Sequence, residues 1–403
     1  MPDARLSELF THRPFVRFWL ARLAGITANQ MLMVAVAWHV YDLTSSAWDL
    51  GLVGLFQFVP ALVMTLPAGH LADRLHRGRI FAACMLGQAL VAGLLVAATQ
   101  GGFATRELIF GVSIVLGVAR AFQMPAQQAL TPLLVPPALL QRAIALSSTG
   151  IQAAVIGGPA LGGVLYAAGA TTVYTCCAAL LLLACALTLT VRYRHVPSTE
   201  SATWRTVLAG VAFVWQRKVL LGATSLDLFA VLLGGATALL PIYARDILHT
   251  GPAGLGLLRA APAFGALAMS LVLTRWPLER RVGHRLLGAV AVFGVATVVF
   301  GLSTHFGLSL LALAVTGAAD NISVVTRLTL VQLETPDAMR GRVAAVNSIF
   351  IGASNQLGEF ESGATAALCG PVGSVVMGGV GTVLVAALWL RLFPALARRD
   401  RMV

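Results

Sequence analysis

Ionisable side chains inside long apolar stretches are the residues of this sequence with the clearest capacity for chemistry. Asp227 and Asp320 stand in such stretches, and Arg327 follows Asp320 on the same helix face at i+7. A charged side chain at mid-membrane costs at least about 2.5–3.5 kcal/mol, so a protein with no use for it has no reason to carry it. A buried carboxylate beside an arginine can hold or lose a proton, according to whether water or a ligand reaches it. These residues therefore predict reversible proton binding.

Other residues share this setting. The proton-coupling candidates are Asp227, Asp320, Glu359, Arg120 and Arg327, and His39, Glu361 and Asp42 are further titratable side chains. Arg120 takes the place of Asp320 when the chain is shifted by 200 residues. A static ion pair or a water-lined helix face would also account for each acid.

Uncharged polar side chains within the apolar stretches could coordinate a small-molecule substrate. These substrate-cavity candidates are Asn29, Gln30, Gln123, Gln127, Asn321 and Gln356. Hydrogen bonds between helices would explain them equally well. The amides therefore do not identify the substrate.

The elements that must position these side chains are membrane-spanning helices. Of the 403 residues, 58% are hydrophobic and only 11% are charged, whereas a soluble domain carries about 25% charged residues. A span needs about 20 mostly apolar residues. Such runs lie at 16–42, 50–71, 79–99, 107–127, 143–168, 171–191, 219–244, 253–274, 285–303, 307–331, 343–368 and 371–392. We predict an all-α membrane protein with twelve transmembrane helices.

The basic residues predict the orientation of the chain. The net charge is +12, and most arginines lie at the helix ends that share a side with the amino terminus. Because basic residues gather on the cytoplasmic side, both termini of this multi-pass protein are expected in the cytoplasm. The charge therefore serves orientation, and a nucleic-acid partner is excluded.

The longest polar connection divides the helices six and six. It predicts an N-terminal bundle at 1–192, a cytoplasmic linker at 193–218 and a C-terminal bundle at 219–403. Trp204 and Trp215, together with arginines, would suit an amphipathic segment on the inner membrane surface, and a plain linker is an equal alternative.

An internal repeat supports this division. A shift of 200 residues aligns Gly117 with Gly317 and Arg142 with Arg342. Two related six-helix halves, pseudo-symmetric in structure, are the simplest interpretation.

A charged segment between the second and third predicted helices carries a known pattern. It has the form Gly-x-x-x-Asp-Arg-x-x-Arg, at Gly69, Asp73, Arg74 and Arg77, with His76 where many examples have glycine. The pattern resembles the hallmark loop of the major facilitator superfamily of transporters. The resemblance implies two six-helix bundles and a gating contact in which Asp73 meets the start of the eleventh helix near Arg342. A carboxylate at a helix amino terminus is favoured by about 0.3–1 kcal/mol, whereas charge for orientation alone leaves Asp73 unexplained.

The fifth predicted helix contains four glycines and a proline within the segment 157–163. Gly158, Pro159, Gly162 and Gly163 are similar to a motif associated with the antiporters of this superfamily, where glycine faces are thought to seal the two halves on the outer side. A generic small-residue packing face is the alternative.

Two further segments narrow the resemblance to the drug:proton antiporters, the branch that contains the enterobactin exporter. They are Phe15-Val16-Arg17-Phe18-Trp19-Leu20 and Pro336-Asp337-Ala338-Met339-Arg340-Gly341-Arg342-Val343. The resemblance implies a central cavity where Arg120, Asp227 and Asp320 would meet. It also implies export of amphipathic small molecules, drug-like compounds or a siderophore, from the cytoplasm by proton antiport with alternating access. The resemblance also implies a monomer. The arginine-rich, almost lysine-free composition fits a high-GC bacterium, and we therefore expect the protein in a bacterial cytoplasmic membrane.

No pattern of an enzyme or an ATP-driven pump is present. Lys218 is the one lysine, so there is no G-x-x-x-x-G-K phosphate loop, and H-E-x-x-H and G-x-S-x-G are absent. The five cysteines lie in apolar runs without metal-ligand spacing, and neither metal nor cofactor is expected. An uncoupled facilitator or lipid transporter of the same fold, or a non-transporting membrane sensor or assembly protein, are the alternatives.

Overall fold

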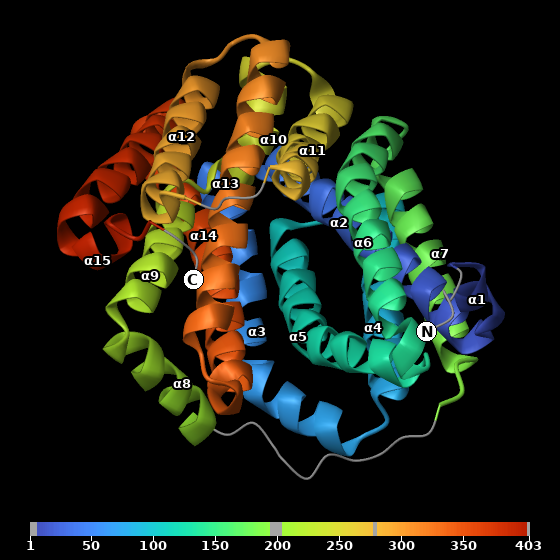
Figure 1. Ribbon diagram of the computed structural model, residues 1–403. Coiled ribbons are helices and arrows are strands. Elements are labelled where there is room, and N and C mark those ends of the chain that lie inside the picture. Colours follow the sequence, from blue (N-terminus) through green and yellow to red (C-terminus); the bar gives the residue numbers. More distant parts are fainter. Residues whose placement is uncertain (1–5, 194–203, 277–279, 401–403) are drawn as a thin grey trace. The chain divides into compact units, whose positions relative to one another are not determined.

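The computed structural model describes residues 6–193, 204–276 and 280–400, and these ranges contain helices and turns but no strand. The chain divides into two compact units, one formed by Met1–Leu43 with Val59–Ala202 and the other by Thr44–Phe58 with Thr203–Val403. The bundle and linker bounds expected from the sequence stay a prediction. Figure 1 shows the helices of each unit coloured along the chain.

The first unit is built from helices whose ends follow local sequence signals. They are α1 (Leu6–Thr11), α2 (Arg13–Thr44), the second half of α3 (Ala47–Arg74), α4 (Arg77–Gly101), α5 (Arg106–Leu130), α6 (Pro137–Ala167) and α7 (Ala170–Leu189). Gly102 ends α4 with a φ of 70°, which glycine adopts without a steric penalty. The Thr105 side chain caps α5 by accepting a hydrogen bond from the Leu108 N–H. Helix α4 packs against both α5 and α7.

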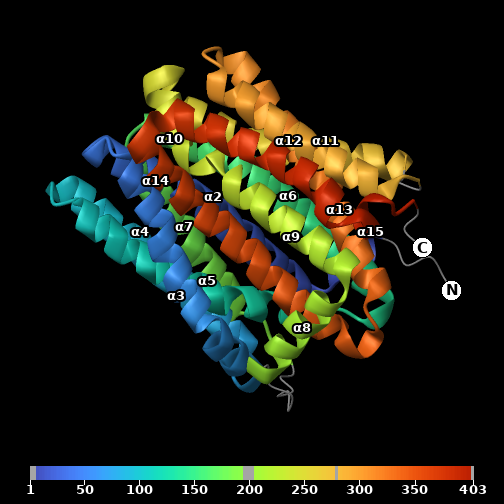
Figure 2. The same ribbon diagram turned by 90° about the vertical axis from the view of Figure 1, so that its left-hand side faces the viewer.

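The second unit holds the first half of α3 and the remaining helices. They are α8 (Trp204–Gln216), α9 (Lys218–Leu233), α10 (Leu240–Ile242), α11 (Gly251–Arg275), α12 (Val282–Leu302), α13 (Phe306–Glu334), α14 (Asp337–Leu392) and α15 (Pro394–Ala397). Short 3₁₀ and π turns at Ala236–Leu239 and Tyr243–Ile247 continue the path of α9 toward α11. Helices α9 and α12 both pack along α14, and Figure 2 shows α9 running beside it.

The predicted spans are present in the structure. Eleven helices of the described residues are long and apolar enough to cross a membrane. The last of these, α14, contains both final predicted spans. Within α14 the backbone leaves the helical conformation at Gly370, with φ 80° and ψ 161°, directly before Pro371, and this break separates the two spans. The prediction of an all-α membrane protein is confirmed.

The long helices expose apolar side chains along their lengths. Leu90 of α4 and Leu384 of α14 are 66% and 63% exposed. Exposed apolar surface on this scale suits contact with lipid rather than with water.

The connection between the sixth and seventh spans is helical over α8. Val214 of α8 is buried in a cluster with Leu220, Val331 and Val343, whereas Trp215 is 70% exposed. Residues 204–216 therefore form a helix with both buried and exposed side chains, as the amphipathic alternative requires. Their location on a membrane surface stays a prediction, and residues 194–203 lie outside the described ranges.

Candidate functional site

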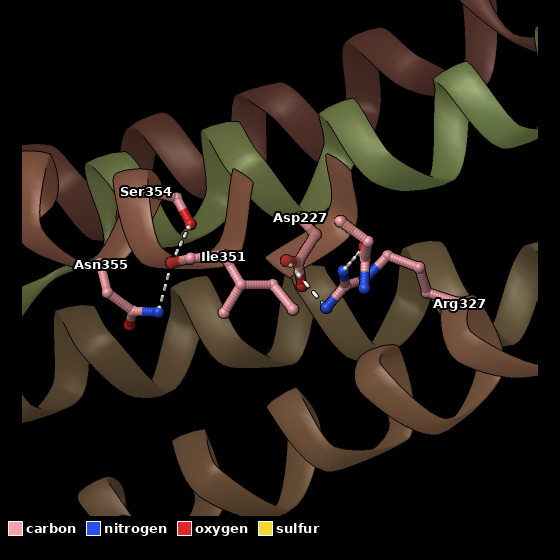
Figure 3. A network of polar contacts seen from close by, with 6 residues as sticks. Asp227, Arg327, Ile351, Ser354 and Asn355 are labelled. Atoms are coloured by element: carbon pink, nitrogen blue, oxygen red, sulfur yellow. Dashed lines mark hydrogen bonds and ion pairs between the residues drawn. The ribbon is translucent and has the colours of Figure 1, made fainter. Parts of the chain in front are cut away.

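A buried ion pair joins two helices of the second unit. Arg327 Nη2 on α13 lies 3.0 Å from Asp227 Oδ2 on α9, and the two side chains are 2% and 7% exposed. Figure 3 shows the carboxylate and the guanidinium pointing toward each other. Withdrawing two charges from water costs several kcal/mol per ion, which their attraction offsets only where the geometry is good and further hydrogen bonds are made. The structure thus brings together two of the residues predicted from the sequence.

A third residue, Asn347 on α14, completes this arrangement and was not predicted. Arg327 Nη1 donates a hydrogen bond to Asn347 Oδ1 at 2.6 Å, and the Asn347 side chain is buried. Arg327 Nε is also buried and has no hydrogen-bond partner among the residues that the structure describes. The guanidinium therefore links α9, α13 and α14.

Asp320 lies beside this ion pair. Asp227 and Asp320 both line a cavity of about 10 Å³, close to the smallest space that holds a water molecule. The other lining residues are Ala230, Val231, Val290, Phe293, Ala319 and Ser323. Asp320 is partly exposed, and within the described ranges no ion pair to it is found, although the charges of Asp227 and Arg327 act on it.

The charge count of this cluster defines its chemistry. One guanidinium, on Arg327, faces two carboxylates, on Asp227 and Asp320. With both acids ionised the cluster carries one uncompensated negative charge in an apolar setting, where such a charge is costly. A single bound proton restores neutrality, and the cavity between the two acids has room for about one water molecule to deliver it.

The acids of α14 lie at a different place. Glu359 interacts electrostatically with Arg259 of α11, and a Cβ on Gly54 would lie 3.0 Å from Glu359 Oε2. Glu361 Oε1 accepts a hydrogen bond from Thr365 Oγ1 at 2.9 Å. Neither glutamate lines the cavity of Asp227 and Asp320.

Two of the amide candidates form hydrogen bonds between helices. Gln88 Nε2 on α4 donates to Gln123 Oε1 on α5 at 2.8 Å, and Asn321 Nδ2 on α13 donates to Ser270 Oγ on α11 at 3.0 Å. Gln127 is buried, and Asn29, Gln30 and Gln356 are partly exposed. The hydrogen-bonding alternative thus has direct support at Gln123 and Asn321.

The titratable candidates of the first unit are Arg120, His39 and Asp42, and Asp42 is exposed near the end of α2. Arg120 is exposed on α5, whereas His39 of α2 is buried and its Nδ1 lies 2.9 Å from the Tyr174 hydroxyl on α7. Since Asp227 and Asp320 belong to the other unit, a meeting of Arg120 with them stays a prediction.

The glycines of α6 lie close to α2. A Cβ on Gly162 would come within 2.8 Å of Met31 Cα, and a Cβ on Gly158 within 2.6 Å of Gln30 Cβ. Pro159 and Gly163 are buried as well. The glycine motif therefore permits close helix contact inside the first unit, and its expected role as an outer seal stays a prediction.

The hallmark loop connects α3 to α4. The side chains of Asp73 and Arg74 lie outside the described residues, so the contact between Asp73 and the start of the eleventh helix stays a prediction. Gly69 and Arg77 are partly exposed, and Arg342 is exposed.

His76, which stands where many hallmark loops have glycine, has a partner that the sequence did not suggest. Its ring packs on Tyr193 with centroids 4.5 Å apart. The Tyr193 hydroxyl accepts a hydrogen bond from the Gly78 N–H at 3.0 Å.

Asn347 and Ser323 are the site residues that the sequence analysis missed. Both are short polar residues within mostly apolar helices, the same signal that selected Asn321 and Gln356. Nothing in the sequence ties Asn347 to Arg327, because that contact depends on how α13 and α14 are rotated against each other.

Comparisons with known proteins agree with this fold. A family model described as transmembrane secretion effector, of the major facilitator superfamily, matches residues 7–401. The chain is 28% identical to the enterobactin exporter EntS of Citrobacter koseri, over 98% of this chain and 95% of the relative. It is 26% identical to EntS of Shigella boydii, with the same two coverages.

Solved transporter structures share the fold at low sequence identity. A bacterial homologue of the human lysosomal transporter Spinster gives a TM-score of 0.73 at 15% identity, covering 96% of this chain and 98% of that one. A bacterial homologue of the iron transporter ferroportin gives 0.71 at 16% identity, covering 96% and 99%. Because the family model spans nearly the whole chain, the protein belongs to the transmembrane secretion effector family of the major facilitator superfamily, and it is a multi-pass membrane transporter, not an enzyme.

Proposed function

We propose that the protein exports amphipathic small molecules from the cytoplasm in exchange for protons, by alternating access. The observation that carries this proposal is that one arginine, Arg327, is ion-paired with buried Asp227, and that half-buried Asp320 lines the same small cavity as Asp227. A cluster with one negative charge in excess binds one proton when it is closed to water and ligand, and can release it when a cationic or polar group of the substrate arrives. Proton and substrate then compete for Asp320.

The remaining parts of the proposal follow the expectations from the sequence. Both termini lie in the cytoplasm, the membrane is a bacterial cytoplasmic membrane, and the protein acts as a monomer. The hallmark loop and the glycine motif of α6 take part in gating. Glu359 and Arg120 are additional coupling candidates.

The substrate class is a drug-like compound or a siderophore. It is supported by the names of the relatives, which are enterobactin exporters and align over 98% of this chain. Identities of 26% and 28% leave ample room for a changed substrate. Amides that are partly exposed, such as Asn29 and Gln356, are the substrate-contact candidates.

An uncoupled facilitator or lipid transporter is the second candidate, because the Asp227–Arg327 pair is almost fully buried and would serve equally well as a fixed link between helices. In that case neither acid needs to change its protonation during transport.

The test is transport by purified protein in liposomes with an imposed pH gradient. The substrates are a panel of lipophilic cationic dyes and a catecholate siderophore, and the wild type is compared with Asp320→Asn and Asp227→Asn. We expect gradient-dependent movement of at least one compound in the wild type and its loss in Asp320→Asn. A matched control is Glu107→Gln, because the Glu107 side chain is 69% exposed at the start of α5.

Movement that ignores both the gradient and the Asp320→Asn change would overturn proton antiport and favour the facilitator. Loss of transport in Glu107→Gln as well as in Asp320→Asn would mean that the assay reports general damage to the protein, and antiport would again lack support.

A further inference from the structure

A second cavity lies at one end of the second unit, away from the acid cluster. Its volume is about 360 Å³, and it is lined by Arg281, His284, Arg398, Arg399 and Asp400. These residues come from the beginning of α12 and from the segment that follows α15. Three arginines and a histidine against one aspartate make the cavity strongly basic.

Backbone hydrogen bonds hold the two sides of this basic cavity together. The N–H groups of Val282 and Gly283 donate to the carbonyl oxygens of Asp400 and Arg399 at 3.3 and 3.0 Å. The Arg281 N–H donates to Asp400 Oδ1 at 3.2 Å. The chain after α15 is therefore fixed against the start of α12, and the Asp400 carboxylate is already engaged.

The arginines differ in how far their charge is balanced. Arg399 Nη2 lies 3.0 Å from Glu334 Oε1 at the end of α13. Arg281 and Arg398 are exposed, and no ion pair joins either of them to another residue in the ranges that the structure describes. The cavity thus offers two unbalanced guanidinium groups, which suit the bidentate recognition of a phosphate.

The size of the cavity and the apolar side chains on the neighbouring helices bear on whether the phosphate belongs to a small ion or to a lipid. A volume of 360 Å³ falls in the range of about 300–1,000 Å³ that small-molecule sites occupy. The two adjacent helices expose apolar side chains: Val295 on α12 and Leu388 and Leu392 on α14 are 54%, 48% and 57% exposed. At the end of α11, Trp276 is 66% exposed, as is typical of an aromatic side chain at a membrane interface.

We propose that the basic cavity binds the phosphate headgroup of an anionic phospholipid, with the acyl chains along α12 and α14. Basic pockets between transmembrane helices on the cytoplasmic side recognise such headgroups, and the orientation expected from the arginines places this end of the unit there. The basic cavity shares no lining residue with the cavity of Asp227 and Asp320. Lipid binding to it can therefore be measured without a transport assay. Free phosphate would make the same contacts with the guanidinium groups, but it has no acyl chains to contact the exposed apolar side chains of α12 and α14.

The test measures lipid binding to the full-length protein in detergent by native mass spectrometry. The probes are phosphatidylglycerol, phosphatidylcholine and inorganic phosphate. Arg398→Gln and Arg281→Asn remove the unbalanced charges and leave the Arg399–Glu334 pair intact; asparagine tolerates the left-handed backbone at Arg281, where φ is 53°. The matched control is Arg391→Gln, which removes an exposed arginine of α14 that does not line the cavity.

We expect phosphatidylglycerol to bind the wild type and Arg391→Gln in preference to phosphatidylcholine, and each cavity variant to weaken that binding about fivefold. Melting temperatures without lipid should be unchanged in all three variants, since the charges removed are exposed. Equal weakening in Arg391→Gln and Arg398→Gln would overturn the proposal in favour of diffuse surface attraction. Binding of inorganic phosphate without preference for phosphatidylglycerol would overturn the assignment to a lipid.

Discussion

Arg327 is held by an acid from α9 and an amide from α14, so removing one partner does not have the same consequence as removing the pair. Asp227→Asn leaves a guanidinium that is 2% exposed without its ion-pair partner. We expect this change to lower the free energy of unfolding by about 3–5 kcal/mol. Thermal unfolding of the purified protein in detergent measures it.

The double variant Asp227→Asn with Arg327→Met serves as the control for this prediction. It removes both charges and fills much of the same volume, which is often close to neutral for a buried ion pair. We therefore expect it to recover most of the stability that Asp227→Asn loses. A single variant as stable as the wild type would contradict the buried pair.

Helix α6 depends on glycine at particular positions and not at others. A Cβ on Gly162 would lie 2.8 Å from the Met31 Cα, a backbone atom that cannot rotate away, whereas a Cβ on Gly157 meets nothing within 4 Å. We expect Gly162→Ala to destabilise the first unit by about 1–3 kcal/mol. Gly157→Ala should be neutral or stabilising by up to about 1 kcal/mol. Unfolding of the two variants side by side checks this, and equal effects would rule out the packing role of Gly162.

Helix positions could be predicted from the sequence because apolar length alone defines a span. The predicted span 79–99 corresponds to α4, Arg77–Gly101, and the predicted gap between 368 and 371 falls on the helix break at Gly370.

The site was predictable only in part. In-span charge singled out Asp227, Asp320 and Arg327, but the amide of Asn347 resembles any polar helix residue until α13 and α14 are packed together. The basic cavity could not be predicted for the same reason, because Arg281 and Arg398 stand 117 positions apart in the sequence.

At the scale of the whole molecule, the family model over residues 7–401 identifies a transporter and does not identify its cargo. Solved structures with TM-scores of 0.71 and 0.73 share only 15–16% of their residues with this chain. We therefore expect the proposed coupling and the choice of substrate to depend on a few side chains that the common helices position. The acid cluster of the second unit is the part of this chain best suited to that task.

The most direct measurement counts the protons released into a weakly buffered solution when a transported compound is added to the purified protein. Because proton and substrate are proposed to compete for Asp320, the account predicts release from the wild type and from Glu107→Gln, and none from Asp320→Asn. Release from Asp320→Asn equal to that from the wild type would contradict it.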